Sequence, residues 1–136
     1  FHPDSIDESE IINHWFETYG IEYLGYAKDP IEAIKQSSVF VLLSYKEGTP
    51  RVVLEAMAMG RPIITADSPG CRETVKEGVN GFLVPTYDYV SAANAMNKLL
   101  NKNLRSEMGA QSRYYCKEKY DVNDVNKKIL SAMNIT

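Results

Sequence analysis

Apolar residues occur along this chain in two kinds of segment, short continuous runs and longer stretches with helical spacing. Four runs have the length of β-strands and end at turn-forming residues: 21–24, 39–43, 62–66 and 82–84. Helical spacing or helix-capping residues mark most of the remaining chain, in segments 4–19, 30–36, 50–59, 71–75, 88–101, 103–118 and 122–133. Strands that alternate with helices predict an α/β fold, a doubly wound parallel sheet followed by C-terminal helices.

Two of these segments carry an expectation about burial. In 4–19, Asp4 or Ser5 is suited to cap a helix. An apolar stripe in the same segment predicts a face that packs in the core: Ile11, Ile12, Trp15 and Phe16. The run 39–43 is apolar at every position, which is typical of a strand buried on both faces. We therefore predict that it is a central strand of the sheet.

The most informative segment is a predicted helix that begins at a Thr-Pro pair. Thr49 is suited to the N-cap, Pro50 to the first helical position and Gly60 to the end of the helix. Apolar residues fill most of 52–59, which predicts a helix buried on all sides. Glu55 breaks this pattern. Because a buried carboxylate without partners is costly, Glu55 must be protonated, paired or directed into a polar cavity.

The start of this helix has the features of an anion-binding site. The first-turn amides of Arg51, Val52 and Val53 have no acceptor within the helix, and together with the helix dipole they attract negative charge. Glu47 precedes these amides and Glu55 follows them. Carboxylates readily accept hydrogen bonds from pairs of sugar hydroxyls. The predicted order of carboxylate, amides and carboxylate therefore matches a sugar linked to a nucleoside diphosphate.

A further turn, Asp-Ser-Pro-Gly, leads into the predicted short helix 71–75. We interpret Asp67 and Glu73 as structural residues that cap the turn and form an ion pair with a neighbouring Arg72 or Lys76. Ser68 is suited to cap the helix that follows it.

Composition narrows the classes of function. The chain has 136 residues, of which 44% are hydrophobic and 24% charged, as expected for one globular domain. A net charge of −3 without a basic block gives no indication of nucleic-acid binding. No apolar run has the length of a membrane span, and no signal peptide is evident. Cys71 and Cys116 do not form a metal-binding pattern and are interpreted as free thiols, with a single disulfide as the alternative.

Residues 44–64 resemble the signature of the retaining glycosyltransferases of family 4, which have the GT-B fold. That signature places two glutamates in the pattern Ser-x-x-Glu-Gly-x-Pro-x-x-x-Leu-Glu-Ala-Met-Ala-x-Gly-x-Pro-Val-Ile. This chain reads Ser-Tyr-Lys-Glu-Gly-Thr-Pro-Arg-Val-Val-Leu-Glu-Ala-Met-Ala-Met-Gly-Arg-Pro-Ile-Ile, without a gap. The alternative is a buried helix in which Glu55 is only ion-paired.

The resemblance implies roles for individual residues. Glu55 corresponds to the residue that binds the ribose hydroxyls. Glu47 corresponds to the one that holds hydroxyls of the donor sugar and places its anomeric carbon, which makes it the candidate catalytic residue. Main-chain amides complete the predicted donor site: Gly48 and Thr49 facing the sugar, Arg51 and Val52 facing the diphosphate.

The loop after the first predicted strand is the expected base-binding segment. By resemblance, Tyr26 and Ala27 would contact uracil, with the ring of Tyr26 as a stacking surface. Ligands of parallel α/β sheets collect at the carboxyl edge, where this loop is expected. A packing role for Tyr26 remains the alternative.

The resemblance also implies how the chain fits into a larger enzyme. A GT-B enzyme has two Rossmann-like domains, and residues 1–136 resemble most of the second, nucleotide-sugar-binding domain. The N-terminal acceptor domain and the first part of this domain would lie upstream, so the piece alone is expected to be inactive. The last helix, 122–133, often returns to the N-terminal domain in this family. Its apolar face is therefore expected to be partly exposed.

The expected enzyme is a retaining hexosyltransferase of cell-surface polysaccharide or lipid-linked glycan synthesis, similar to bacterial capsule and O-antigen enzymes. Its donor is expected to be a UDP-hexose or UDP-N-acetylhexosamine, with GDP-mannose still open, and its acceptor a lipid-linked sugar. No cofactor or metal is expected. The expected location is the cytoplasm, at the inner face of the membrane for the whole protein. A non-catalytic nucleotide-sugar-binding module and a GT-B epimerase are the alternatives.

Overall fold

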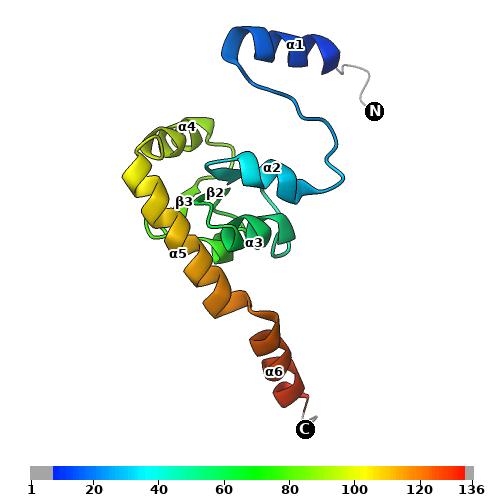
Figure 1. Ribbon diagram of the computed structural model, residues 1–136, viewed down its shortest axis with the longest axis vertical. Coiled ribbons are helices and arrows are strands. Elements are labelled where there is room, and N and C mark those ends of the chain that lie inside the picture. The colour runs from blue at the N-terminus through cyan, green and yellow to red at the C-terminus, as the bar shows by residue number, and fades with distance from the viewer. Residues whose placement is uncertain (1–7, 134–136) are drawn as a thin grey trace.

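The computed structural model describes residues 8–133 of the chain. Three parallel strands form a single sheet in the order β1-β2-β3: β1 Phe40–Leu42, β2 Ile63–Ala66 and β3 Gly81–Val84. The helices are α1 Glu8–Tyr19, α2 Pro30–Gln36, α3 Arg51–Ala58, η1 Arg72–Thr74 (a 3₁₀ turn), α4 Tyr89–Lys98, α5 Lys102–Tyr120 and α6 Val122–Ala132 (Figure 1). The predicted α/β fold with a parallel sheet and C-terminal helices is confirmed.

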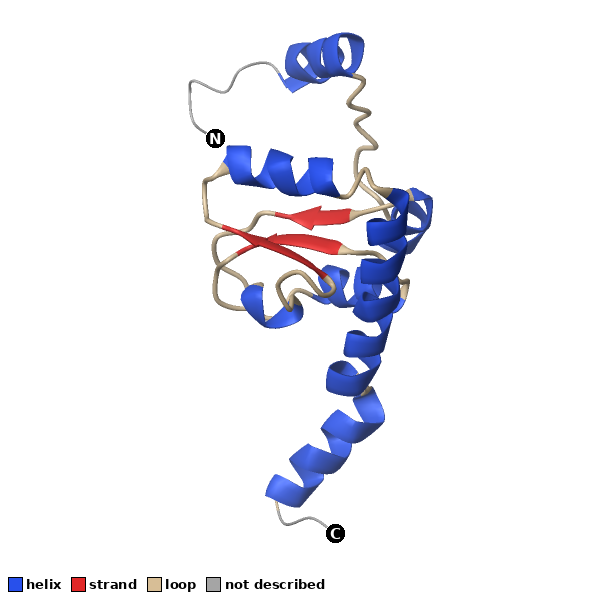
Figure 2. Cartoon of the chain, turned by 90° about the vertical axis from the view of Figure 1, so that its left-hand side faces the viewer, coloured by secondary structure: helices blue, strands red, loops and turns tan. Residues whose placement is uncertain are grey.

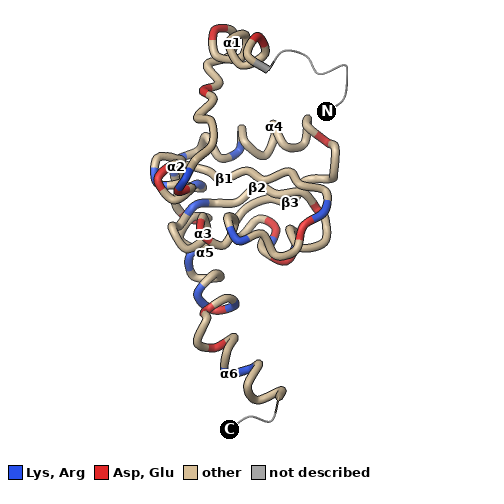
Figure 3. Tube along the Cα trace, turned by 90° about the vertical axis from the view of Figure 1, so that its right-hand side faces the viewer, with Lys and Arg blue, Asp and Glu red and all other residues tan. Residues whose placement is uncertain are grey.

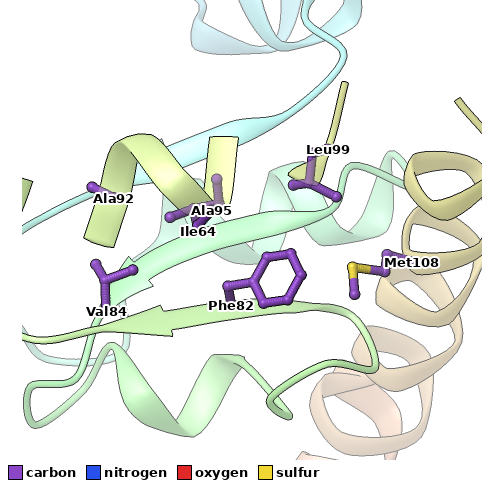
Figure 4. Packing of buried hydrophobic residues seen from close by; sticks show 7 residues of the cluster. All are labelled: Ile64, Phe82, Val84, Ala92, Ala95, Leu99 and Met108. Atoms are coloured by element: carbon purple, nitrogen blue, oxygen red, sulfur yellow. The ribbon is translucent and has the colours of Figure 1, made fainter. Parts of the chain in front are cut away.

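Helices cover both faces of the sheet (Figure 2). Because successive strand residues point to opposite faces, each strand contributes to two cores. The core on the α4 side brings together residues of β2, β3, α4 and α5 (Figure 4): Ile64, Phe82, Val84, Ala92, Ala95, Leu99 and Met108. The core on the opposite face contains Ile34 of α2, Val53 and Met57 of α3, and Ile63 of β2. The sheet is therefore the middle layer of three.

The prediction that 39–43 forms a central strand is wrong. β1 pairs only with β2 within the part of the chain that the structure describes, and its residues are half-buried. The fully buried central strand is β2. The predicted strand 21–24 is also wrong, because this segment is an exposed coil without a strand partner. An apolar run has the potential to form a strand, but it needs a neighbour to pair with.

The apolar stripe of α1 does not pack in the core as expected. Trp15 and Phe16 are 47% and 59% exposed, and Ile11 and Ile12 are half-buried. Figures 1 and 2 show the reason, since α1 stands apart from the sheet at the end of the extended segment that follows it. The predicted capping residues Asp4 and Ser5 lie outside the described residues.

The helix that begins at the Thr-Pro pair starts one residue later than predicted. Pro50 is the N-cap and α3 begins at Arg51, so Thr49 lies outside the helix. The predicted end at Gly60 is confirmed. Gly60 has φ +72, and its amide and that of Arg61 donate to carbonyls of the last turn at 2.9 and 3.0 Å. α3 is not buried on all sides, because Arg51 and Ala58 are exposed.

The C-terminal part of α5 is bonded to one main-chain oxygen of η1. The Glu73 carbonyl accepts hydrogen bonds from Lys119 Nζ at 2.7 Å, Tyr120 Oη at 2.9 Å and Tyr115 Oη at 3.4 Å. Burial raises the pKa of the Tyr120 hydroxyl. Lys119 also lies over both tyrosine rings. These contacts join the longest helix to the loop that follows β2.

The last helix, α6, has no buried residue. Its apolar residues Val122, Ile129 and Leu130 are exposed, as the family resemblance led us to expect. Within residues 8–133, every helix is too short or too polar to span a bilayer.

Both cysteines are free thiols, as predicted. Burial raises the pKa of the Cys116 thiol, whose Sγ donates to the Leu54 carbonyl at 3.5 Å. Because the thiolate is the reactive form, iodoacetamide should label Cys116 several-fold more slowly in the folded chain than in urea at pH 7.5. Peptide mass spectrometry would separate Cys116 from the buried Cys71. Equal labelling rates for Cys116 in the two states would contradict this expectation.

Candidate functional site at the carboxyl edge of the sheet

The loops that follow the three strands are bonded to one another. Ser68 Oγ donates to the Ser44 carbonyl at 2.8 Å, and the Asp67 amide donates to the Val84 carbonyl at 2.7 Å. The prediction that Ser68 caps η1 is therefore wrong. Its buried hydroxyl needs an acceptor, and the Ser44 carbonyl provides one. These bonds fix the position of the Ser44–Gly48 loop above the sheet.

The sequence predicted structural roles for Asp67 and Glu73, which lie in the segment after β2. Within the described residues, the ion pair expected for each of them is present for Asp67 only. Asp67 forms an ion pair with Arg72 Nε at 2.9 Å, as expected. The exposed carboxylate of Glu73 forms no ion pair within residues 8–133. Glu73 contributes through its main-chain carbonyl, which the charge pattern of a sequence cannot indicate.

Gly70 lies directly against the loop that carries Glu47. Its φ is +86, and a Cβ atom at this position would lie 2.2 Å from the carbonyl oxygens of both Glu47 and Gly48. No larger residue fits without displacing that main chain. Gly70 therefore allows the loops after β1 and β2 to come into contact.

The predicted catalytic residue Glu47 lies on this supported loop, together with Gly48 and Thr49, and all three are exposed. The next residue, Pro50, is buried and begins the entry into α3. The loop thus places three exposed residues, one of them a carboxylate, at the carboxyl edge, where ligands of α/β sheets bind.

Glu55 lies one turn inside α3, with its side chain 23% exposed. Arg51 Nε donates to its Oε1 at 3.0 Å, so the paired state that the sequence left open is present. Glu55 also borders a hollow of about 420 Å³, lined by Asp29, Pro30, Ile31, Arg51, Val52 and Glu55. The Arg51 side chain is 91% exposed, and exposed pairs of this kind contribute at most about 1 kcal/mol. A ligand hydroxyl can therefore replace the guanidinium.

The sequence predicted that the amides of Arg51, Val52 and Val53 are all free to bind an anion, and within the described residues this is correct for the first two only. Val53 is not free, because its amide donates to the Pro50 carbonyl at 3.0 Å. The amides of Arg51 and Val52 come before this first helical bond, where a helix has no internal acceptor for them. Two amide groups, rather than three, are thus left at the helix start for an anion.

The predicted base-binding residues, Tyr26 and Ala27, do not line the hollow that Arg51, Val52 and Glu55 share. Tyr26 is 94% exposed and Ala27 is exposed, and both belong to the coil before α2. Neither lines the hollow that Glu55 borders. The structure thus brings together Arg51, Val52 and Glu55, but not Tyr26 and Ala27. The alternative, a packing role for Tyr26, is wrong, because its side chain is 94% exposed. Contact of Tyr26 and Ala27 with a base stays a prediction.

The sequence interpretation missed that α2 forms one wall of the hollow. Asp29 caps α2 through a 3.0 Å bond from the Ile31 amide, and Ile31 is exposed toward the hollow rather than buried. In the sequence alone, the Asp29-Pro30 pair indicates only a helix start. Its place directly after the expected base-binding loop was the available signal.

Charge does not concentrate at this edge. Figure 3 shows Lys and Arg interspersed with Asp and Glu along the trace. Among the described residues, no group of three or more His, Cys, Asp or Glu is arranged to hold a metal ion. The candidate groups for a ligand are therefore carboxylates, main-chain amides and the Arg51 guanidinium.

A three-layered fold with these groups at its carboxyl edge defines a Rossmann-like domain of the GT-B type. Residues 12–119 match the family described as glycosyl transferases group 1, and the chain belongs to that family. The resemblance identified from residues 44–64 is thus confirmed at the level of the family.

Among curated proteins, the chain is 30% identical to the capsular polysaccharide biosynthesis glycosyltransferase CapM of Staphylococcus aureus, covering 96% of this chain and 34% of that protein. It is 32% identical to N,N'-diacetylbacillosaminyl-diphospho-undecaprenol alpha-1,3-N-acetylgalactosaminyltransferase of Campylobacter jejuni, covering 81% and 29%. The chain therefore spans about a third of the length of these relatives. Among solved structures, Anabaena Alr3699/HepE in complex with UDP matches with a TM-score of 0.81 at 22% identity, covering 94% of this chain and 37% of that one.

Proposed function

We propose that this chain is the donor-binding domain of a glycosyltransferase that uses a UDP-linked hexose or N-acetylhexosamine. The observation that carries the proposal is the placement of Arg51, Val52 and Glu55 around one hollow at the start of α3, directly after the loop of Glu47. The relatives named for capsule and undecaprenol-linked glycan synthesis support a lipid-linked or polysaccharide acceptor. An upstream N-terminal domain would supply most of the acceptor site.

The proposed reaction follows from the chemistry of these groups. The bond between the anomeric carbon and the diphosphate oxygen breaks, and a bond to an acceptor hydroxyl oxygen forms. The acceptor hydroxyl passes its proton to the leaving diphosphate. The amides of Arg51 and Val52 would stabilise the charge that develops on the leaving diphosphate. Glu55 would hold the ribose hydroxyls and Glu47 those of the donor sugar, which positions the anomeric carbon. We propose retention of configuration without a metal ion, at the cytoplasmic face of the membrane.

Titration of the chain with UDP, GDP and ADP, followed by heteronuclear NMR, tests this proposal. We expect UDP to shift the amides of Gly48, Arg51 and Val52. In Glu55→Ala these shifts should be lost, because the ribose loses its acceptor. Glu107→Ala removes an exposed carboxylate of α5 outside the hollow and should leave them unchanged. Larger shifts with GDP or ADP than with UDP would show that the donor carries guanine or adenine instead of uracil. No shift with any nucleotide would refute a donor site at the start of α3.

The two alternative functions, a non-catalytic nucleotide-sugar-binding module and a GT-B epimerase, can be distinguished by the reaction that the whole protein catalyses. Hydrolysis or transfer of the donor by the whole protein would exclude a non-catalytic module. Release of the unchanged nucleotide with an epimerised sugar would indicate an epimerase. The family match favours the transferase, because the chain belongs to the glycosyl transferases group 1.

A further inference from the structure

A second hollow, of about 370 Å³, opens at the same edge of the sheet next to the start of α4. This volume lies within the range of small-molecule pockets. It is lined by residues at or next to the ends of all three strands and by three tyrosines: Leu43, Ala66 and Val84, with Tyr45, Tyr87 and Tyr89. The donor site described above uses none of these residues.

The tyrosines present aromatic surface to solvent in a fixed arrangement. The rings of Tyr45 and Tyr87 stack with centroids 5.4 Å apart and an interplanar angle of 24°. They remain 64% and 80% exposed, so each keeps surface for a ligand. Tyr87 has φ +63 and is the one residue other than glycine with a positive φ within 8–133. A bulky side chain in this conformation is costly, and such strain concentrates at binding sites.

The lining residues indicate the chemistry of the ligand. Among the described residues that line the hollow there is one carboxylate, Asp88, and no lysine or arginine. A surface with a carboxylate and without a cationic side chain does not attract phosphate, so this hollow does not favour a nucleoside diphosphate. Ser91 donates to both oxygens of Asp88, at 2.9 and 2.6 Å, which fixes this carboxylate beside the rings. Aromatic faces with hydroxyls and a carboxylate suit a neutral pyranose, whose C–H face stacks while its hydroxyls bond.

The hollow also lies close to the proposed chemistry. Tyr45 and Glu47 are two residues apart, so their Cα atoms are within roughly 7.6 Å of each other. The hydrogen bonds from Ser68 to Ser44 and from Asp67 to Val84 hold the neighbouring loops in place. A sugar that stacks on Tyr45 would therefore bind to the same loop that carries Glu47, the residue proposed to hold the donor sugar.

We propose that the Tyr45–Tyr87 hollow binds a pyranose ring of the acceptor glycan. The assignment to the acceptor rests on the proposed transferase function. The binding of a sugar ring does not, because it follows from the lining residues alone.

Saturation-transfer difference NMR of the chain with methyl α-glycosides of glucose, galactose and N-acetylglucosamine tests the proposal. We expect saturation of at least one glycoside, weakened about tenfold in Tyr45→Ala and in Tyr87→Gly. Glycine suits φ +63, so Tyr87→Gly removes the ring without adding backbone strain. Tyr114→Ala, which removes an exposed ring of α5, is the matched control and should bind as the unchanged chain does.

The outcomes separate this proposal from that of the donor site. Tyr87→Gly should retain the UDP shifts at Gly48 and Arg51, whereas Glu55→Ala should retain glycoside binding. Absence of glycoside binding, or binding that neither tyrosine substitution weakens, would overturn the proposal. Perturbation of the tyrosines by farnesol but by no glycoside would overturn it too, in favour of a lipid chain.

Discussion

Replacing Gly70 with alanine is expected to lower the free energy of unfolding by about 3 kcal/mol and to abolish nucleotide binding. Two costs add at this position. The backbone has φ +86, and the new Cβ would lie 2.2 Å from the carbonyl oxygens of Glu47 and Gly48. Main chain cannot yield as a flexible side chain does, so the Glu47 loop must move. Urea denaturation and UDP titration would measure the two effects.

Gly78 provides the matched control. Its φ is +71, close to that of Gly70, but a Cβ atom would meet no atom within 4 Å. Gly78→Ala should therefore cost about 1 kcal/mol, from the backbone conformation alone, and leave UDP binding intact. Equal losses of stability in the two variants would show that contact with the Glu47 loop is unimportant.

Replacing Glu47 with glutamine in the whole enzyme is expected to reduce sugar transfer about 100-fold while UDP still binds. Glutamine keeps the shape of the side chain but removes its charge and changes its hydrogen bonding to sugar hydroxyls. Glu47 is exposed on its loop, so the fold should be unaffected. Initial rates with the donor sugar and UDP affinity for the same preparations would be compared.

Lys46→Gln is the control for a change of charge on the same loop, because Lys46 is exposed and adjacent in sequence to Glu47. It should retain most of the transfer rate. A Glu47→Gln enzyme with unchanged transfer would remove Glu47 from the mechanism, and one that no longer bound UDP would place it in nucleotide binding instead.

The sequence predicted those elements whose burial follows from their own residues. The strand at Ile63–Ala66 is apolar enough to be buried in any sheet, and Asp29-Pro30 marks the start of α2 without reference to the rest of the fold. Prediction failed where an element depends on a partner. Trp15 and Phe16 form a core-type stripe, yet no core of the described chain reaches them.

The candidate site likewise contains residues that the sequence could predict and contacts that it could not. Glu47 and Glu55 could be located from the motif, because both belong to one continuous stretch of sequence. The spacing of Arg51 and Glu55 on consecutive helical turns also allows an ion pair to be foreseen. The Tyr45–Tyr87 stack could not be foreseen, since its residues follow different strands and meet only after the sheet has formed.

The Glu73 carbonyl that joins η1 to α5 makes this connection tolerant of mutation. Its acceptor is main chain, so no substitution at position 73 deletes it. A carbonyl oxygen has two lone pairs, and three donors from α5 compete for them. Loss of one donor still leaves two. Sequence drift at Tyr115, Lys119 or Tyr120 can thus proceed one position at a time without detaching the helix from the loop layer that supports Glu47.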